Sequence, residues 1–259
     1  MKKFIATLLL LLMPVLQARE EVITPELLQL LEHFKIEHDG TLASVTDATQ
    51  KAWLRPAGQE RWEVVCTYTA EDRAKVIEYY AKTGKFEEKF PSKKRYHAVL
   101  LCGATMNKMS RRIRFFERVV DAGVHVDNVA LIAGARPLTP SIGEVVEDAR
   151  TEGDAFVSLW KISRLSQELP WRIAEHPMKG DRRPDRYDTF KYWLQKEFPP
   201  QTLLIVTDQP YCCFTEAIAA KAFPEGFDYE VVGEGFDPSS MTTAVLLDNL
   251  ARWLYAVNN

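Results

Sequence analysis

The sequence has few of the features that assign a protein to a common functional class. Four of its 259 residues are cysteine, which is too few for a disulfide-stapled scaffold. The formal net charge of −3 gives no global basic surface, so nucleic acid is not expected as a partner. After residue 18, no apolar run approaches the ~20 residues that span a bilayer.

Motifs of the common enzyme classes are also absent. The sequence contains no GxSxG and no HExxH, and its five histidines are not spaced as a metal site. It contains neither GxGxxG nor a Walker sequence, so no dinucleotide or NTP assignment follows and the cofactor stays unknown. The adjacent Cys212 and Cys213 lack CxxC spacing and a nearby histidine, which argues against redox or metal chemistry there. For Cys66 and Cys102, buried free thiols are favoured over a disulfide.

The first 18 residues have the pattern of a signal peptide. Lys2 and Lys3 precede an apolar run over residues 4–12, and Ala18 offers a small residue for cleavage. An uncleaved membrane anchor is the alternative. We therefore expect a periplasmic or secreted protein that has no stable transmembrane segment once the signal is removed.

Residues 19–95 predict a helical or mixed extension ahead of the main domain. Helices are expected from Thr24, over residues 47–54 and over residues 70–82, with a strand over residues 62–68. Thr24 is a typical N-cap, and the proline that follows it suits the first turn of a helix.

Residues 96–259 predict an α/β domain. Its buried parallel strands are expected at the short continuous apolar runs over residues 98–101, 129–133 and 203–206, and a further strand is expected over residues 229–232. Helical patterns separate these runs, and a last helix is expected over residues 242–257. Residues 168–188, rich in proline and charge, predict an irregular connection. The alternation favours a Rossmann-like three-layer sandwich with a mainly parallel sheet.

The four predicted strands end in turns that meet at the carboxyl edge of the sheet, where ligands bind in open α/β proteins. The first turn opens a helix with basic residues in its first turns, which favours a small anionic ligand. A solvated helix face is the alternative for these basic residues. The candidate ligand-binding residues are Gly103, Thr105, Asn107, Arg111, Arg112, Gly134, Arg136, Asp188, Thr189, Gln209 and Tyr211.

Glu152 and Asp208 are the candidate catalytic residues, because a carboxyl group at this edge can orient a ligand or act as acid or base. Arg112 and Arg136 would hold the anion, while Asp188 would help to close the site. Each acid also lies close to a helix start, where capping is the alternative role. If the protein is an enzyme, a transferase or hydrolase acting on a phosphate-bearing substrate is expected.

Several segments within residues 96–232 form one pattern. They are a strand ending in Gly103, the turn 133–136, the helix starts at 151–152 and 188–189, and the strand 204–207. Together they resemble the YdcF/SanA/ElyC-like family of bacterial envelope proteins. The resemblance implies an α/β fold, a phosphate-bearing or nucleotide-like ligand and a role in envelope maintenance.

The sequence departs from this family after the strand that ends at Thr207. The family has a histidine and an arginine there, whereas this chain has Asp208, Gln209, Pro210 and Tyr211. The departure indicates a divergent branch. It also supports a second hypothesis, in which a non-catalytic envelope interaction protein keeps a degenerate pocket and contacts protein partners through its amino-terminal helices.

Overall fold

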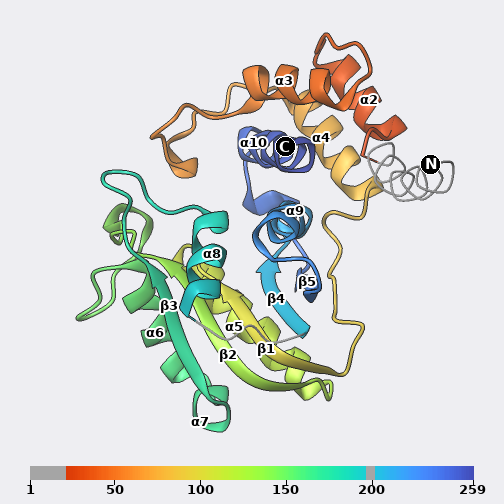
Figure 1. Ribbon diagram of the computed structural model, residues 1–259. Coiled ribbons are helices and arrows are strands. Elements are labelled where there is room, and N and C mark those ends of the chain that lie inside the picture. The colour runs from red at the N-terminus through yellow and green to blue at the C-terminus, as the bar shows by residue number, and fades with distance from the viewer. Residues whose placement is uncertain (1–21, 197–201) are drawn as a thin grey trace, which may run out of the picture. The chain divides into compact units, whose positions relative to one another are not determined.

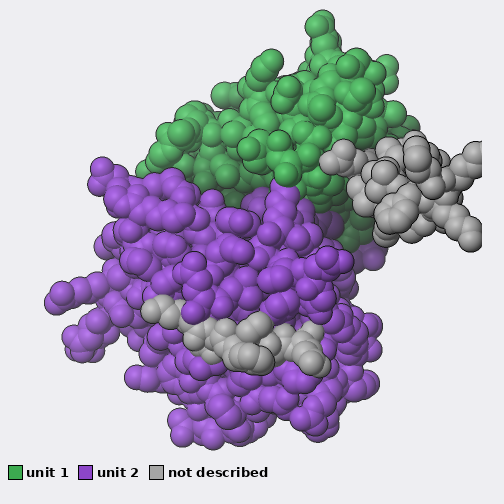
Figure 2. Space-filling model, viewed as in Figure 1, with its two compact units in different colours: residues 1–86, 237–259 green, residues 87–236 purple. Residues whose placement is uncertain are grey.

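The computed structural model describes residues 22–196 and 202–259 (Figure 1). The predicted signal peptide therefore lies outside the described residues, as does the predicted end of a helix at residue 197. The chain forms two compact units, shown in different colours in Figure 2. The helical unit contains Met1–Phe86 and Asp237–Asn259, and the α/β unit contains Glu87–Phe236.

The α/β unit is built on a five-stranded parallel sheet with the order β3-β2-β1-β4-β5. The strands are β1 (Arg95–Cys102), β2 (His125–Gly134), β3 (Trp171–His176), β4 (Thr202–Asp208) and β5 (Asp228–Glu234). The apolar runs in β1 and β4 are completely buried, which explains why these strands lack an alternating pattern. The predicted Rossmann-like α/β fold is confirmed, with the strand order reversing between β1 and β4.

Helices cover both faces of this sheet (Figure 1). Successive residues of β1 point to opposite faces, so Val99 and Leu101 join one apolar core while Ala98 and Leu100 join the other. The first core is closed by α5 (Met106–Asp121) and α6 (Glu152–Ile162), and the second by α8 (Arg186–Lys196) and α9 (Cys212–Ala222). The short helix α7 (Leu165–Glu168) follows α6.

Helix α5 carries the apolar stripe that its sequence predicts. Met109, Ile113 and Phe116 are buried, and each fully buried side chain of this size contributes about 1.5–3 kcal/mol. Gly123 follows the helix with φ = 83°, a left-handed conformation that glycine adopts without strain. The helix therefore fixes its amino-terminal turns at the carboxyl edge of the sheet.

Strand β3 differs from the sequence prediction, because residues 168–188 were expected to be irregular. The strand pairs in parallel with β2 and forms one edge of the sheet. Ala174 is its buried residue, whereas Ile173 is 38% exposed. An edge strand with so little burial lacks the continuous apolar run by which the central strands are recognised.

The helical unit contains α2 (Pro25–His33), α3 (Leu42–Trp53), α4 (Ala70–Lys82) and α10 (Thr243–Asn258). Helix α10 packs against α3 and α4, and the Tyr80 hydroxyl donates to the Leu246 carbonyl oxygen at 2.7 Å. The domain boundary predicted from sequence placed this last helix in the α/β domain, whereas it groups with the amino-terminal helices. Its residues from Thr243 to Ala251 are all buried, so it needs cover from several elements at once.

The segment between α3 and α4 also differs from its prediction. A strand was expected over residues 62–68, but a short 3-10 helix (Arg61–Glu63) is followed by residues without regular structure. Val65 is 79% exposed, so this segment lacks the burial that holds a strand in a sheet. Cys66 is exposed as well, in contrast to the buried thiol predicted, while Cys102 is buried as predicted; neither of the two forms a disulfide.

Candidate functional site

The turn after β1 lies at the carboxyl edge and leads into α5. Thr105 is the N-cap of this helix but makes no side-chain capping hydrogen bond. An ideal Cβ on Gly103 would overlap Oε1 of Glu152 and lie 2.8 Å from the carbonyl oxygen of Ile132. Glycine is therefore required at position 103, because it lets the carboxyl group of Glu152 approach the turn.

Arg112 bridges β1 and β4 where the strand order reverses. Its Nη1 donates to the carbonyl oxygens of Cys102 and Gly103 at 2.6 and 2.9 Å, and its Nε donates to Oδ1 of Asp208 at 2.7 Å. Both side chains of this ion pair are 2% exposed. Burial raises the pKa of Asp208, but the Arg112 and Lys108 cations outweigh it and hold that pKa below its ordinary value.

Lys108 places a second positive charge beside Asp208. Its Nζ lies 3.6 Å from Oδ2 of Asp208 and 4.1 Å from the ring centroid of Tyr211. The Lys108 side chain is 26% exposed, so solvent reaches it, whereas Tyr211 is buried. Among the described residues, Oδ2 of Asp208 accepts no hydrogen bond. Lys108 is thus a solvent-accessible cation beside the buried Arg112–Asp208 pair.

Arg136 follows β2 and holds two carboxylates. Its Nη1 and Nη2 each donate to one oxygen of Glu144 at 2.7 Å, and its Nε donates to Oε2 of Glu152 at 3.1 Å. The Glu144 side chain is 1% exposed and also accepts a hydrogen bond from the backbone N–H of Thr139 at 2.9 Å. Arg136 is therefore the centre of a buried network of three charged groups.

The two carboxylates on Arg136 have pKa values shifted in opposite directions. Burial raises the pKa of Glu144, but hydrogen bonds from Arg136 and from backbone N–H groups outweigh it, so the net shift is downward. For Glu152, burial is the larger effect and exceeds the opposing effect of Arg136, so its pKa lies above the ordinary value. A proton therefore binds preferentially to Glu152, whose side chain is 13% exposed.

Glu152 is the first residue of α6, but it does not cap that helix. Thr151 is the N-cap, and its hydroxyl accepts from the backbone N–H of Asp154 at 3.1 Å. The Asp154 carboxylate in turn accepts from the backbone N–H of Thr151 at 3.1 Å, which completes a capping box. The capping alternative considered for Glu152 is thus taken by Asp154, and the Glu152 carboxyl group faces the sheet edge.

Asp188 and Thr189 make local interactions at the start of α8. Asp188 accepts from the backbone N–H of Asp185 at 3.1 Å and pairs with Lys179 and Arg182. Asp185 returns the bond by accepting from the Asp188 N–H, so these two acids cap the helix reciprocally. The Thr189 hydroxyl donates to the Arg186 carbonyl oxygen. Asp188 therefore anchors the turn before α8.

The remaining candidate residues lie on α5, at the end of β2, which is Gly134, and directly after β4. Arg111 donates to Oε2 of Glu234 at 2.8 Å and to the carbonyl oxygen of Gly235. The Gln209 side chain donates to the backbone carbonyl of Glu87 at 2.9 Å. Asn107 is exposed in the first turn of α5. The edge thus gathers Arg111 and Asn107 on one helix, whereas Gln209 links β4 to the segment before β1.

Two residues at this edge were not predicted from sequence. Glu144 lies in a polar connection without a recognisable motif, so nothing in the sequence distinguishes it from neighbouring acids. Arg186 donates to the hydroxyls of Thr207 and Thr215 at 3.1 and 2.6 Å, which joins the end of β4 to α9. It follows Asp185 at a helix start, a position that suggests capping rather than a role at the edge.

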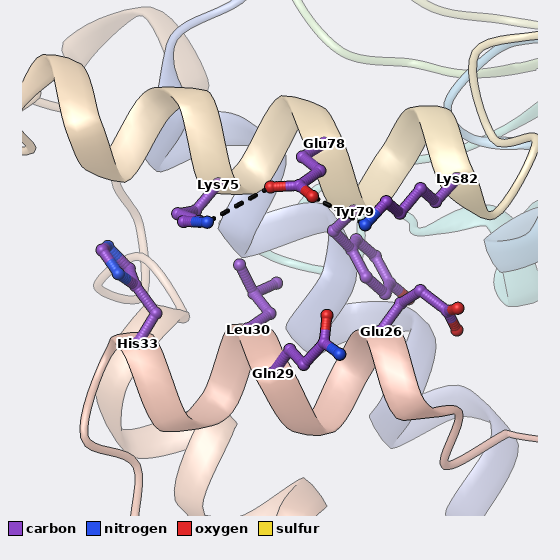
Figure 3. A pocket seen from close by; sticks show the side chains of 8 residues that line it. All are labelled: Glu26, Gln29, Leu30, His33, Lys75, Glu78, Tyr79 and Lys82. Carbon is purple, nitrogen blue, oxygen red and sulfur yellow. Dashed lines mark hydrogen bonds and ion pairs between the residues drawn. The ribbon is translucent and has the colours of Figure 1, made fainter.

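The helical unit contains a separate groove between α2 and α4, with a volume of about 200 Å³ (Figure 3). Its lining residues are Glu26, Gln29, Leu30, His33, Lys75, Glu78, Tyr79 and Lys82. Glu78 pairs with Lys75 at 3.3 Å and with Lys82 at 2.7 Å. These three side chains are 44–52% exposed, so their charges compensate one another in solvent.

Within residues 22–196 and 202–259, no helix combines the length and apolar character needed to cross a membrane. The same residues contain no group of three or more His, Cys, Asp or Glu side chains arranged to hold a metal ion. Comparison with protein-family models, curated proteins and solved structures gives no match to this chain. The functional conclusion therefore depends on the geometry of the sheet edge.

Proposed function

We propose that the protein binds a small phosphate-bearing or nucleotide-like anion at the carboxyl edge of the α/β sheet, where Glu152 transfers a proton. The observation that carries this proposal is the geometry at Arg136, which binds Glu144 through Nη1 and Nη2 at 2.7 Å and Glu152 through Nε at 3.1 Å; burial raises the pKa of Glu152, whereas hydrogen bonds lower that of Glu144. Carboxyl groups whose environments separate their pKa values in this way are typical of acid–base sites. A ligand can reach Glu152, since its side chain is 13% exposed.

The charge around α5 supports an anionic ligand. Lys108 and Arg111 lie in the first two turns of this helix, and their side chains are 26% and 30% exposed. The amino terminus of a helix favours negative charge, because its first backbone N–H groups have no partner within the helix. A phosphoryl group can contact both cations while they keep their carboxylate partners. Arg112 and Asp208 then act as the buried support that fixes β1 to β4.

The proposed reaction class is hydrolysis or group transfer on a phosphate-bearing substrate. A protonated Glu152 can donate its proton to a leaving oxygen, and the same group can accept a proton once it is ionised. By the resemblance described above, the protein is proposed to be an exported, divergent YdcF-like protein with a role in the cell envelope. The signal-peptide pattern in the first 18 residues supports export.

Thermal unfolding with a panel of nucleotides, sugar nucleotides and polyprenyl-phosphate analogues tests the binding step. A ligand at one hundred times its Kd should stabilise the fold by about 2.7 kcal/mol. Lys108→Ala should remove this stabilisation, because it deletes an accessible cation at the edge. Arg114→Ala is the matched control, since Arg114 is an exposed residue of the same helix. A ligand that stabilises both variants equally would remove Lys108 from the site.

A second candidate function is a non-catalytic envelope interaction protein with a degenerate pocket. It is favoured by the finding that Arg112 and Arg136 already hold Asp208 and Glu144. This function predicts that no member of the panel stabilises the protein. It also predicts that a partner co-purifies equally with the full chain and with Glu152→Gln. Loss of the partner in that variant would argue against a role independent of the pocket.

A further inference from the structure

Residues 138–150 form a closed loop at the carboxyl edge. Its neck is held by backbone hydrogen bonds from Glu152 to the Arg136 carbonyl at 2.8 Å and from Leu138 to the Arg150 carbonyl at 3.1 Å. Pro137 and Thr151 are joined there by an isolated antiparallel bridge. Compact loops whose ends lie close together in this way are frequently functional.

Most residues of this loop are exposed to solvent, but the loop also contains one buried carboxylate, that of Glu144. Val145 is 71% exposed, and Gly143, Glu147 and Asp148 are exposed as well. The Glu144 side chain is 1% exposed. An ionised group is costly to bury unless its partners satisfy it, so strong contacts must hold Glu144 in place.

The groups that contact Glu144 are an arginine guanidinium and backbone N–H groups, which are the donors that usually bind a phosphoryl group. Arg136 presents two N–H groups to the two oxygens of Glu144 at 2.7 Å each, in the fork geometry that arginine also offers to phosphate. The backbone N–H of Thr139 donates at 2.9 Å, and that of Met106, the first residue of α5, also favours the ionised form. An arginine fork and a helix amino terminus thus converge on an anion of the protein itself.

We infer that Arg136, the Thr139 N–H and the start of α5 form a subsite for a phosphoryl or carboxylate group, which Glu144 occupies until a ligand displaces it. Displacement releases the Glu144 side chain and the exposed residues beside it, while Leu138, Val146 and Ala149 keep their packing against the apolar core, so the loop loosens when the ligand binds. This inference rests on the proposed function, since it names the group by which the ligand is held and the way in which access to it is controlled.

The positions of the two acids explain why Glu144 is the one that leaves. Glu152 begins α6 and is fixed by that helix, whereas Glu144 lies on an exposed loop. After displacement, Arg136 keeps its Nε bond to Glu152 and gains the anion of the ligand. The Arg136 guanidinium therefore always has a negative partner. The ligand's anion takes the place of the Glu144 carboxylate on the same N–H groups.

Hydrogen–deuterium exchange of residues 138–150 and calorimetric binding of inorganic pyrophosphate test the inference in the full chain. Glu144→Gln keeps the shape of the side chain but removes its charge, and Glu147→Gln is the matched control on the exposed part of the loop. We expect Glu144→Gln to exchange faster in this loop and to bind pyrophosphate at least about tenfold more tightly than wild type. Glu147→Gln should match wild type in both measurements.

The outcomes separate this inference from the function on which it rests. If wild type and Glu144→Gln bind pyrophosphate equally and their loops exchange alike, self-occupation is overturned while anion binding stands. If neither protein binds pyrophosphate, the phosphoryl subsite and the proposed ligand class fail together. Glu144→Ala is the second variant, and it should reproduce the faster exchange and tighter binding of Glu144→Gln.

Discussion

Arg112 and Arg136 both lie at the carboxyl edge of the sheet, and both are buried against carboxylates, yet their partners differ in kind. Arg112 contacts the end of β1 and Asp208 at the end of β4, which are parts of the sheet itself. Arg136 contacts Glu144 on an exposed loop and Glu152 at a helix start. A buried arginine whose partners are fixed can only support the fold, whereas one with a partner on a loop can exchange that partner.

The largest expected effect comes from removing the first arginine. Arg112→Met would leave Asp208 buried with Lys108 as an ion-pair partner at 3.6 Å, and it would remove one donor from each of two carbonyl oxygens. We expect the free energy of unfolding to fall by about 3–5 kcal/mol, as measured by urea denaturation. Arg114→Met, on the exposed face of α5, should change it by less than about 0.5 kcal/mol. A similar small loss for Arg112→Met would show that the ion pair does not support the sheet.

A smaller loss of stability is expected from Arg136→Met. Without the guanidinium, Glu144 can move into solvent with its loop, so its charge need not stay buried. We expect a loss of about 1–2 kcal/mol in urea denaturation, with faster hydrogen exchange confined to residues 138–150. If Arg112→Met and Arg136→Met destabilise the protein equally, the contrast between a fixed and an exchangeable partner would be wrong.

The smallest effect is a difference in pH dependence. Burial holds the pKa of Glu152 above its ordinary value of 4.5 despite Arg136, so the folded state binds this proton more tightly than the unfolded chain. Its contribution to stability is complete below pH 4.5 and is lost as pH rises through the folded pKa. Glu152→Gln has no such loss, so its stability should increase relative to wild type between pH 4.5 and 7, as measured by thermal unfolding.

Asp208→Asn is the matched control for this measurement, because Asp208 has the opposite shift. Its folded pKa lies below the ordinary value of 3.8, since Arg112 and Lys108 outweigh the effect of burial. Its contribution to stability is present above pH 3.8 and is lost as pH falls through the folded pKa. The deficit of Asp208→Asn should therefore stay constant between pH 5 and 7. A parallel drift in both variants would indicate that neither carboxyl group causes the change.

The sequence predicts the strands that contain adjacent buried apolar residues and misses the strand that does not. The strands β1, β2 and β4 contain continuous apolar runs and β5 contains the buried pair Val231 and Val232, whereas β3 at the other edge has one buried residue. The packing of α10 could not be predicted from its apolar pattern. That pattern shows which side of the helix is buried, but not which other helices cover it. The fold class can therefore be predicted from short apolar patterns in this chain. Which helices pack together into one unit cannot be predicted in that way.

One part of the candidate site could be predicted from the sequence and another part could not. The turns after the strands lie at one edge because parallel strands bring their carboxyl ends together. The pairing of Arg136 with Glu144 depends on how residues 138–150 fold back, and no sequence period describes such a loop. One signal was available: Thr151 followed three residues later by Asp154 is a capping-box pattern, and it indicates that Glu152 is not needed as the cap.

The grouping of α10 with α2, α3 and α4 has a consequence for the order in which the chain folds. The chain emerges from its amino-terminal end, so residues 22–86 appear before the α/β unit and the helix that covers their apolar faces appears after it. The apolar surface of the amino-terminal helices therefore stays uncovered until the roughly 150 residues of the α/β unit have followed. A premature stop codon in the last helix would leave the α/β unit complete but the helical unit without its centre.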